Sequence, residues 1–469
     1  MEKNKGNNKN LSTIASLTII SGIILFVCLT GLMAGVSAKD KTYENLKVFS
    51  EAITYIQENY VDEVEDSELI YGAIKGMLRD LDPHSSFMTS DMYKEMQVDT
   101  RGRFEGIGIE ITIKDEQLTI VSPIEGTPAF KAGLKAGDLI LKIDDQPTRD
   151  LSLSEAAKRI RGPKGTEVGL MIWRKGFEKA KKYTITRGVV KLASVYSKIL
   201  KDTNIGYIRI RQFQEDSTKD VKDAIKDIAA DSLDGLIIDI RFNAGGLLNV
   251  AVDIADIFLP KDRVIVSTKG KVKEQSMVLK SNHDSLIPDY PIVVLVNAGS
   301  ASASEILAGA LKDWKRAVIL GTKTFGKGSV QTIYPLGDGS ALRLTTAKYY
   351  TPNGTSIHGE GITPDILVEN LLPDDKKRIL SEEHAIREKD LIEMDRSTKN
   401  REDSEEENNK DKEKESTKEE AEGEGKEEEE GEGMGYIEDL QLQRSIDIIK
   451  ANNIFKASSK QNTEHKEIL

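Results

Sequence analysis

The sequence predicts an α/β fold with a largely parallel sheet. Between residues 205 and 368, apolar segments typical of strands alternate with amphipathic segments typical of helices, as in strand–helix–strand units. The strand segments are NIGYIRIRQF, DGLIIDIR, YPIVVLVN and RAVILG; the helical segments are DSTKDVKDAIKDIAA, LLNVAVDIADIF and SASEILAGALKDW. Glycine-bearing turns, AGG and AGS, follow two of the strands. Because ligands of such sheets gather at the carboxyl ends of strands, we expect a functional site at these turns.

The segments that precede this region have a different character. Apolar residues at helical spacing predict two amphipathic helices between residues 41 and 80. From about Tyr93 to Arg187, five short strand segments surround one helix, SLSEAAKRI, which we expect to begin at Ser152 or Ser154. Near the end of the α/β region, SVQTIYPL and ALRLTTAKYY predict two more strands.

The N-terminal segment predicts a membrane anchor. Three lysines precede an uncharged stretch, residues 10–38, whose apolar centre is long enough to cross a bilayer. The lysines favour a cytoplasmic N-terminus. A cleaved signal peptide is the alternative, because Val36, Ser37 and Ala38 resemble a cleavage site, although the apolar span exceeds the usual length of about 7 to 15 residues. The single cysteine, Cys28, lies in this stretch, so the remainder contains neither a disulfide nor a catalytic thiol.

An acidic stretch near the C-terminus accounts for most of the net charge. Residues 396–433 contain 17 acidic and 8 basic side chains, in a chain of 469 residues with net charge −12. Because the stretch has a single apolar residue, we expect it to be disordered; a cation-binding or partner-binding tail is the alternative. After it, YIEDLQLQRSIDIIKA predicts an amphipathic helix. No basic patch with interleaved aromatic residues occurs, which argues against a nucleic-acid partner.

A serine, a lysine and a glutamine follow the predicted strands at usable spacing. Ser302 lies where YPIVVLVN leads into a helix, and Lys327 lies between two glycines in GTKTFGKGSVQ. A neutral lysine can accept the proton of a serine hydroxyl, provided that burial lowers its pKa from about 10.4 toward 7 to 8. Gln331 is four residues further on, so in an extended segment it faces the same side and could orient the amine.

Two turns offer amides that could stabilise an oxyanion. The amide of Ala303 lies near a helix N-terminus, and Gly245 or Gly246 supplies another from the AGG turn. The competing explanations are a strand-to-helix glycine loop and a capping box formed by Ser302 and Glu305. The lysine segment also approaches a phosphate-binding loop, but it has glycine where serine or threonine would bind magnesium.

Other motifs give weaker signals. The segment Gly106-Ile107-Gly108-Ile109 could form a nest of amides for a peptide carboxylate, and hairpin glycines are the alternative. His84 and His358 lie in turn-like segments, but neither has a recognisable nucleophile-elbow partner or a His-x-x-x-His metal spacing. We therefore interpret both histidines as structural.

Together these motifs resemble the carboxyl-terminal processing peptidases, also called tail-specific proteases, over nearly all of the chain beyond the apolar N-terminal segment. NAGSASASEILAGAL and GTKTFGKGSVQ are similar to the serine and lysine blocks of that family, and DPHSSFM, DIRFNAGG and SIHGEGITPD resemble its other recurring segments. The acidic insert is a departure from the family pattern.

The resemblance implies a protease core similar to the crotonase and ClpP fold, with an inserted PDZ domain. It implies that Ser302 is the nucleophile, Lys327 the general base and Gln331 the partner that orients the lysine. It places the oxyanion donors at Ala303 and at Gly245 or Gly246. In the PDZ domain it implies a carboxylate loop at residues 106–109, and it implies that Arg161 links this domain to the protease body.

The expected organisation has six parts. They are a cytoplasmic stub with a transmembrane anchor (1–39), an N-terminal helical region (40–92), a PDZ domain (93–187), a protease core (188–380), an acidic disordered insert (381–433) and a C-terminal helical segment (434–469). We expect a single-pass membrane protein whose catalytic part is extracytoplasmic and whose substrates are proteins or peptides with free C-termini. A homodimer is possible, no cofactor or metal is implied, and a non-catalytic PDZ scaffold is the alternative function.

Overall fold

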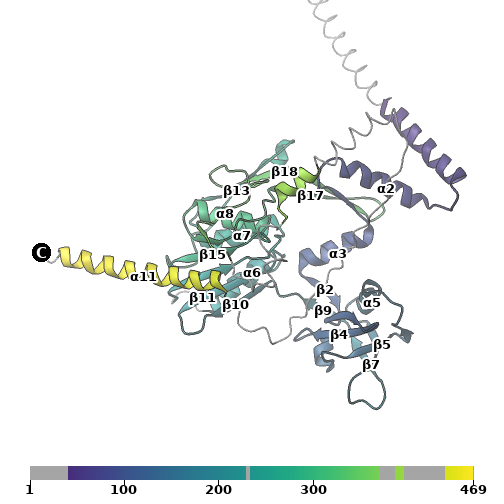
Figure 1. Ribbon diagram of the computed structural model, residues 1–469, viewed down its shortest axis with the longest axis horizontal. Coiled ribbons are helices and arrows are strands. Elements are labelled where there is room, and N and C mark those ends of the chain that lie inside the picture. The colour runs from purple at the N-terminus through teal and green to yellow at the C-terminus, as the bar shows by residue number, and fades with distance from the viewer. Residues whose placement is uncertain (1–40, 229–232, 370–385, 396–438, 468–469) are drawn as a thin grey trace, which may run out of the picture. The chain divides into compact units, whose positions relative to one another are not determined.

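The computed structural model describes residues 41–228, 233–369, 386–395 and 439–467 (Figure 1). Its largest sheet has the strand order β10-β11-β12-β15-β16-β19. All neighbouring strands in it are parallel except the pair β10 and β11. The strands are β10 (Val195–Ile199), β11 (Ile205–Ile210), β12 (Gly235–Asp239), β15 (Ile292–Val296), β16 (Val318–Gly321) and β19 (Ile366–Leu367). The predicted α/β fold with a largely parallel sheet is confirmed.

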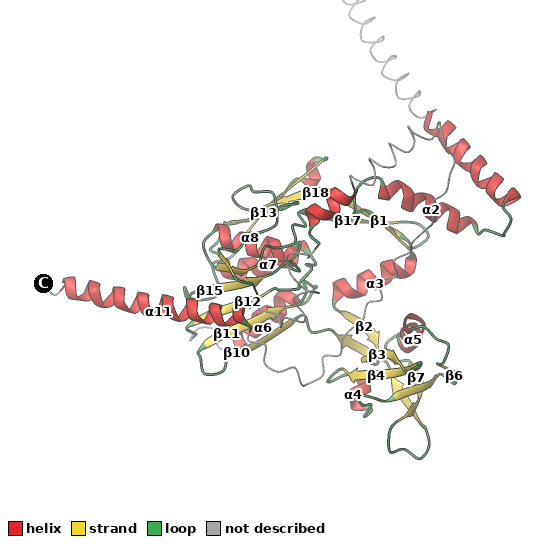
Figure 2. Ribbon diagram, viewed as in Figure 1, coloured by secondary structure: helices red, strands yellow, loops and turns green. Residues whose placement is uncertain are grey.

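Helices cover both faces of this sheet. On one face, Leu236 and Ile238 of β12 pack in a core with α6 (Ser217–Asp227), α7 (Leu248–Phe258) and α8 (Ala303–Asp313). On the other face, Ile237 packs in a second core that includes Ile449 of α11 (Leu440–Glu467). Alternate residues of β12 are buried on opposite sides, and Leu236, Ile237 and Ile238 are all apolar, as expected for a parallel sheet covered on both faces. Figure 2 shows the helices around these strands.

A second sheet is antiparallel and is organised around one long strand. In it β18 (Ala341–Tyr350) pairs with β17 (Ser329–Pro335) along one edge and with β1 (Ser86–Met88) and β13 (Val264–Gly270) along the other. The strand β14 (Val278–Lys280) extends the sheet beyond β13. The register between β17 and β18 shifts between Val330 and Gln331, and such irregularities re-aim side chains near functional sites.

Residues 103–191 form a module with its own core. The two-stranded pair β2 (Arg103–Gly106) and β9 (Gly188–Lys191) lies at its ends in sequence. Between them is a sheet of order β3-β4-β5-β7-β8 with β6 paired to β5, plus the helices α4 and α5. The elements are β3 (Ile109–Lys114), β4 (Gln117–Pro123), α4 (Pro128–Lys131), β5 (Leu139–Ile143), β6 (Gln146–Pro147), α5 (Leu153–Ile160), β7 (Glu167–Trp173) and β8 (Lys181–Thr186).

The helix α5 begins where the sequence predicts. Ser152 is its N-cap: the amide of Glu155 donates to the Ser152 hydroxyl at 3.3 Å, and the Glu155 carboxylate accepts from the Ser152 amide at 3.0 Å. Ala156 and Ile160, four residues apart on one face, are buried in the core of the module. The capping box and the apolar face together explain why this short helix is stable in place.

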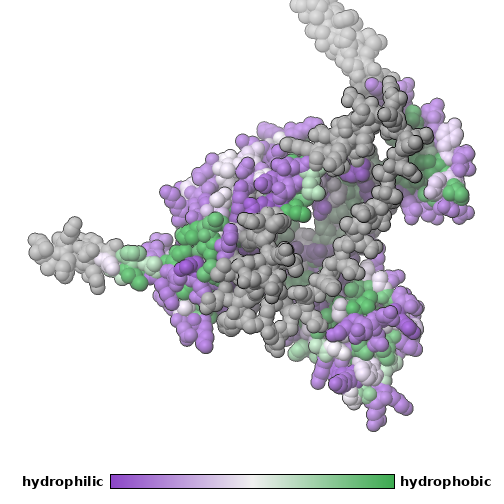
Figure 3. Space-filling model, viewed as in Figure 1, coloured by the Kyte–Doolittle hydropathy of each residue, from purple (hydrophilic) through white to green (hydrophobic). Residues whose placement is uncertain are grey.

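The N-terminal unit contains the two predicted amphipathic helices, at residues 41–59 and in α2 (Asp66–Arg79). Their faces carry exposed apolar side chains, including Leu46, Tyr55 and Met77. Figure 3 shows green, hydrophobic surface among the purple residues of these helices. The segment then continues into α3 (Ser90–Arg101), whose N-cap is Thr89.

The predicted anchor, residues 1–39, lies outside the described residues. Within the described parts of the chain, no helix has both the length and the apolar composition to cross a membrane. The acidic stretch 396–433 also lies outside them. Residues 386–395, which fall inside the expected insert of residues 381–433, are described: a helix covers 388–395, and Glu388 at its start is fully buried.

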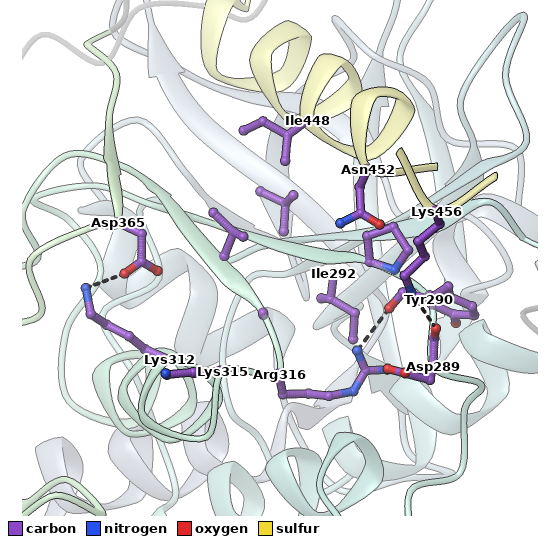
Figure 4. Close-up of a pocket in the computed structure, with 14 residues that line it drawn as sticks. Asp289, Tyr290, Ile292, Lys312, Lys315, Arg316, Asp365, Ile448, Asn452 and Lys456 are labelled. Atoms are coloured by element: carbon purple, nitrogen blue, oxygen red, sulfur yellow. Dashed lines mark hydrogen bonds and ion pairs between the residues drawn. The ribbon is translucent and has the colours of Figure 1, made fainter. Parts of the chain in front are cut away.

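One pocket of about 360 Å³ lies beside the start of β15 (Figure 4), whereas Ser302 follows the end of that strand. It is lined by Ile292 at the start of β15, by Arg316 and by Asn452 of α11. The Arg316 guanidinium donates to the carbonyl of Tyr290 at 3.0 Å there. None of the predicted site residues lines this pocket, so we do not assign the chemistry to it.

Candidate active site

Ser302 lies at the sharp turn between β15 and α8. Its backbone has φ 54° and ψ −112°, in a region that residues other than glycine seldom adopt. Such a conformation costs about 1–3 kcal/mol and persists only where the surrounding structure holds it. A strained strand-to-helix turn presents a nucleophile above a sheet. Ser302 has the strained backbone that is typical of such a turn, and its side chain is half-buried.

The predicted capping box joins Ser302 and Glu305 at the start of α8. The amide of Ser302 donates to Glu305 Oε2 at 2.8 Å, whereas the amides of Glu305 and Ile306 donate to the Ser302 carbonyl. The Ser302 side chain makes no cap hydrogen bond. Ser302 is thus the N-cap residue of α8, and Glu305 completes the predicted capping box by accepting from the Ser302 amide.

Glu305 connects the serine turn to the lysine segment. Its Oε1 accepts from the Thr324 hydroxyl at 2.5 Å and from the Gly326 amide at 2.7 Å, while Oε2 accepts from Ser302. Burial raises the pKa of this carboxyl to about 7, although the hydrogen bonds oppose the shift. Glu305 thus fixes both segments to one carboxylate, a role beyond the capping function that the sequence suggested.

Lys327 is half-buried, in an environment that disfavours its charged form. Burial lowers the pKa of the Lys327 amine, and the nearby guanidinium of Arg343 lowers it further. The carboxylates of Glu388 and Glu305 act in the opposite direction. The net direction is the one that a lysine base requires.

The Ser302 hydroxyl and the Gln331 side-chain amide are hydrogen-bonded to residues other than Lys327 in this structure. The Ser302 hydroxyl is hydrogen-bonded to the phenol of Tyr349, whose pKa burial raises to about 12. Gln331 Nε2 donates to Thr345 Oγ1 at 2.9 Å and to Ser329 Oγ at 3.2 Å. Among the described residues, no hydrogen bond joins Lys327 to Ser302 or to Gln331.

The AGG turn packs directly against the serine turn. A methyl group added at Gly245 would lie 2.9 Å from Ser302 Cβ and 3.0 Å from the Ala303 nitrogen. Gly245 also has φ 107°, which disfavours any side chain. The predicted neighbours Gly245, Ser302 and Ala303 are thus brought together by two strand ends of the large sheet.

The two glycines of this turn differ in whether their amides are free. The Gly245 amide donates to Asn243 Oδ1 at 2.9 Å. The Phe213 amide donates to the Gly245 carbonyl at 3.0 Å, and the Leu247 amide donates to the Phe213 carbonyl at 2.8 Å. In this parallel bridge the amide of Gly246 itself points away from Phe213. Within the described residues the amides of Gly246 and Ala303 have no acceptor, and Ala303 is the first residue of its helix. These two amides are the better candidates for oxyanion donors.

The predicted peptide-binding loop connects β2 to β3 in the small module. Gly106 ends β2, Ile107 is fully buried, and Gly108 has φ 79°. The carbonyls of Ile107 and Gly108 accept from the amides of Ala129 and Ile124, at 2.8 and 3.0 Å, which fixes the loop. Ile109 begins β3, an edge strand of its sheet. An edge strand that follows a fixed glycine loop can receive an extended peptide.

Arg161 caps the other end of α5. Its guanidinium lies over the ring of Phe104 in β2, 5.0 Å from the ring centroid, and its Cα lies near Gly106. This cation–π contact joins α5 to the strand that leads into the loop. The predicted link from Arg161 to the protease body is not among its contacts in the described residues.

Some neighbours of the site carried no recognisable sequence signal. The strand β18 supplies three of them, Arg343, Thr345 and Tyr349, at even spacing. Their even spacing indicates only that the three side chains share one face of a strand. The pairing of β17 with β18 then shows that this strand lies beside the one that carries Gln331. His84, expected to be structural, contacts the buried Glu388 through Nε2 at 2.7 Å.

Comparison with known protein families gives three matches in chain order. Residues 30–92 match the model described as the N-terminal domain of the activating protease CtpB. Residues 119–174 match the PDZ domain model, and residues 204–368 match peptidase family S41. The small module described above is therefore a PDZ domain, as the resemblance implied.

Curated relatives extend the similarity over most of the chain. A carboxy-terminal-processing protease of Bartonella bacilliformis is 46% identical over 364 residues, which is 76% of this chain and 83% of the relative. A carboxyl-terminal-processing protease of Synechocystis sp. is 42% identical over 325 residues, 68% of this chain and 75% of that protein. Among solved structures, a photosystem II D1 C-terminal processing protease is 30% identical, covers 72% of this chain and 92% of its own, and has a TM-score of 0.41. The chain belongs to peptidase family S41, the carboxyl-terminal-processing proteases, and is a PDZ-containing serine endopeptidase.

Proposed function

We propose that the protease uses a serine-lysine dyad in which Ser302 is the nucleophile and Lys327 the general base. One observation carries this proposal: Glu305 joins Ser302 and Lys327. Its carboxylate accepts hydrogen bonds from the backbone amides of both residues. Ser302 lies on a strained turn, and Lys327 has a lowered pKa. The amides of Ala303 and Gly246 would stabilise the oxyanion. Gly245 allows the close approach of the two turns.

The proposed reaction has two halves. Ser302 Oγ bonds to the carbonyl carbon of the scissile peptide while the neutral Lys327 amine takes the hydroxyl proton. The resulting ammonium then donates that proton to the leaving amine nitrogen as the carbon–nitrogen bond breaks, which leaves an acyl ester on Ser302. In the second half Lys327 takes a proton from water, the hydroxide oxygen bonds to the acyl carbon, and the ester bond to Ser302 breaks with return of the proton.

The conformation described here needs a local rearrangement before this reaction. Ser302 is hydrogen-bonded to Tyr349, and Gln331 to Thr345 and Ser329. We propose that substrate binding exchanges the Tyr349 contact of Ser302 for one with Lys327. Hydrogen bonds of catalytic groups are often long or absent before substrate binds.

A serine-directed fluorophosphonate tests the dyad. We expect covalent labelling, located by mass spectrometry at Ser302, and loss of labelling in Lys327→Ala with an unchanged thermal unfolding temperature. A peptide substrate should be added in a second arm, because binding could induce the reactive conformation. Labelling at another serine, or full labelling of Lys327→Ala, would contradict the proposal; no labelling in either arm would favour the alternative of a non-catalytic scaffold.

We further propose that the PDZ domain selects free C-termini. The amides of the loop from Gly106 to Ile109 would bind the terminal carboxylate, and the edge of β3 would pair with the peptide backbone. Arg161, stacked on Phe104 and close to Gly106, would hold α5 against the strand that leads into this loop.

Blocking the terminal carboxylate should therefore slow cleavage. We expect a C-terminally amidated peptide to have kcat/KM about 10-fold or more below that of the free acid, because charge-assisted hydrogen bonds to the carboxylate are lost. The measurement compares the two peptides at one salt concentration, with Gly108→Val as the control. Gly108 has φ 79°, and an added Cβ would lie 2.5 Å from Thr127 Cβ, so this variant should cleave both peptides slowly. Equal rates for the two peptides on the wild-type enzyme would remove the carboxylate from the proposal.

The remaining expectations are also proposals. We propose that residues 1–39 anchor the protein in a cell membrane with its catalytic part outside the cytoplasm; the lysines and the uncharged stretch of residues 10–38 support this. We also propose that the core is related to the crotonase and ClpP fold, and that the chain can form a homodimer.

A further inference from the structure

The side-chain amide of Gln331 is anchored at one end and unpartnered at the other. Its Nε2 donates to Thr345 Oγ1 and Ser329 Oγ, as described above. Its Oε1 is buried and has no hydrogen-bond partner among the described residues. A buried amide oxygen without a donor is unfavourable, so its environment should supply a donor at some stage. The donor that the proposed mechanism offers is the amine of Lys327.

The orientation of this amide is decided by Asp82. Thr345 Oγ1 lies 3.0 Å from Asp82 Oδ1, and an ionised carboxylate can only accept, so the Thr345 hydroxyl must donate to it. The Thr345 oxygen is then an acceptor for Gln331. Only the NH₂ end of the amide can donate to it, so Oε1 is turned away from Thr345. The hydrogen-bond chain therefore removes the ambiguity between the two ends of the amide.

Asp82 is itself firmly held. Its Oδ1 accepts from the amides of His84 and Ser85 at 2.8 and 2.9 Å, and its Oδ2 accepts from Ser85 Oγ at 2.7 Å. Burial would raise the pKa of Asp82, but these hydrogen bonds and that of Thr345 lower it below its usual value. The carboxylate therefore stays ionised near neutrality, as the orientation of Thr345 requires. The Thr345 amide also donates to Ser85 Oγ at 3.1 Å, which joins this turn to β18.

We propose that Asp82 and Thr345 are positioning residues that hold Gln331 with its oxygen available to Lys327. The inference rests on the proposed roles of Lys327 and Gln331. Its starting point is the juxtaposition of the DPHSSFM segment with β18, more than 200 residues away in sequence.

The orientation matters because the lone pair of a neutral amine is its catalytic group. When the Gln331 oxygen accepts an N–H of Lys327, the lone pair of the amine is left for the proton of Ser302. If the amide flips, its NH₂ donates to that same lone pair, and the base is occupied. The chain from Asp82 through Thr345 to Gln331 excludes the flipped orientation.

The test compares two substitutions of one residue. Thr345→Val keeps the β-branched shape but removes the hydroxyl, and we expect kcat to fall about 10- to 100-fold with little change in KM. Thr345→Ser keeps the hydroxyl and should retain most of the activity. Thr346→Val is the matched control, because it makes the same chemical change on the next residue of β18 and breaks the hydrogen bond of Thr346 to Thr332 instead. This control should stay within about 2-fold of wild type.

A double substitution distinguishes positioning from general support of the fold. In a Gln331→Ala background, adding Thr345→Val should lower kcat no further, because the relay acts through the amide that is already missing. A further 10-fold loss would overturn the inference, as would wild-type kcat in Thr345→Val alone. If Thr345→Val unfolds at lower temperature than the assay permits, Thr345→Ala replaces it in both comparisons.

The outcome also separates this inference from the proposed function. An active Lys327→Ala would contradict the dyad itself. An inactive Lys327→Ala and a slow Gln331→Ala, together with a fully active Thr345→Val, would contradict only the positioning role of Asp82 and Thr345.

Discussion

Substitution of Ser302 by alanine is expected to reduce kcat for peptide hydrolysis by at least about 10⁴-fold, because removal of a nucleophile abolishes the acyl-enzyme route. The turn itself should be preserved. The contacts that hold it, from the Ser302 amide to Glu305 and from the amides of Glu305 and Ile306 to the Ser302 carbonyl, involve only the backbone of residue 302. We therefore expect the thermal unfolding temperature to change little, as measured by circular dichroism on the same preparations used for kinetics.

Ser304→Ala is the matched control, because it makes the same chemical change two residues along α8. Its hydroxyl is buried and donates to the carbonyl of Asn243 at 2.8 Å, so its loss should destabilise the fold by about 1 kcal/mol. Its activity should stay within a few-fold of wild type. Full hydrolysis by Ser302→Ala would show that Ser302 is not the nucleophile. Loss of hydrolysis in Ser304→Ala alone would point to Ser304 instead.

The sequence predicted the elements that depend on local pattern. The strand β15 was recognised because YPIVVLVN is an apolar run, and α5 was expected to begin at Ser152 or Ser154, of which Ser152 is the N-cap. The turns that carry Ser302 and Gly245 were recognised because they follow such strands. In each case the information lies within about ten residues of chain, which is the range over which periodicity and capping act.

The sequence could not show contacts that depend on pairing between distant segments. Asp82 and Thr345 meet because β1 pairs with β18, and no local pattern of either segment specifies that partner. Glu388 shows that the composition of a segment can also mislead about a single residue. It lies in a charged part of the chain that composition assigns to solvent, yet it is buried beside His84. Composition describes the average of a segment and not the burial of one side chain.

Substitution of Lys327 by arginine is expected to abolish hydrolysis as completely as substitution by alanine, at least about 10³-fold in kcat. Arginine keeps the positive charge and much of the length, but its guanidinium does not lose a proton in the accessible pH range and so cannot serve as a base. Activity that survives in Lys327→Arg but not in Lys327→Ala would show that the residue supplies charge and not proton transfer.

The pH dependence of the wild-type enzyme follows from the same argument. Burial and Arg343 lower the pKa of Lys327, and only the neutral amine is a base, so kcat/KM should rise as pH increases through that lowered pKa and then level off. Glu305, with a pKa of about 7, could also produce such a limb. Arg343→Gln separates the two groups, because Arg343 is a main cause of the lowered pKa of Lys327 and is not among the main influences on the pKa of Glu305. Loss of this cation should move the limb to higher pH; an unmoved limb would assign the titration to Glu305.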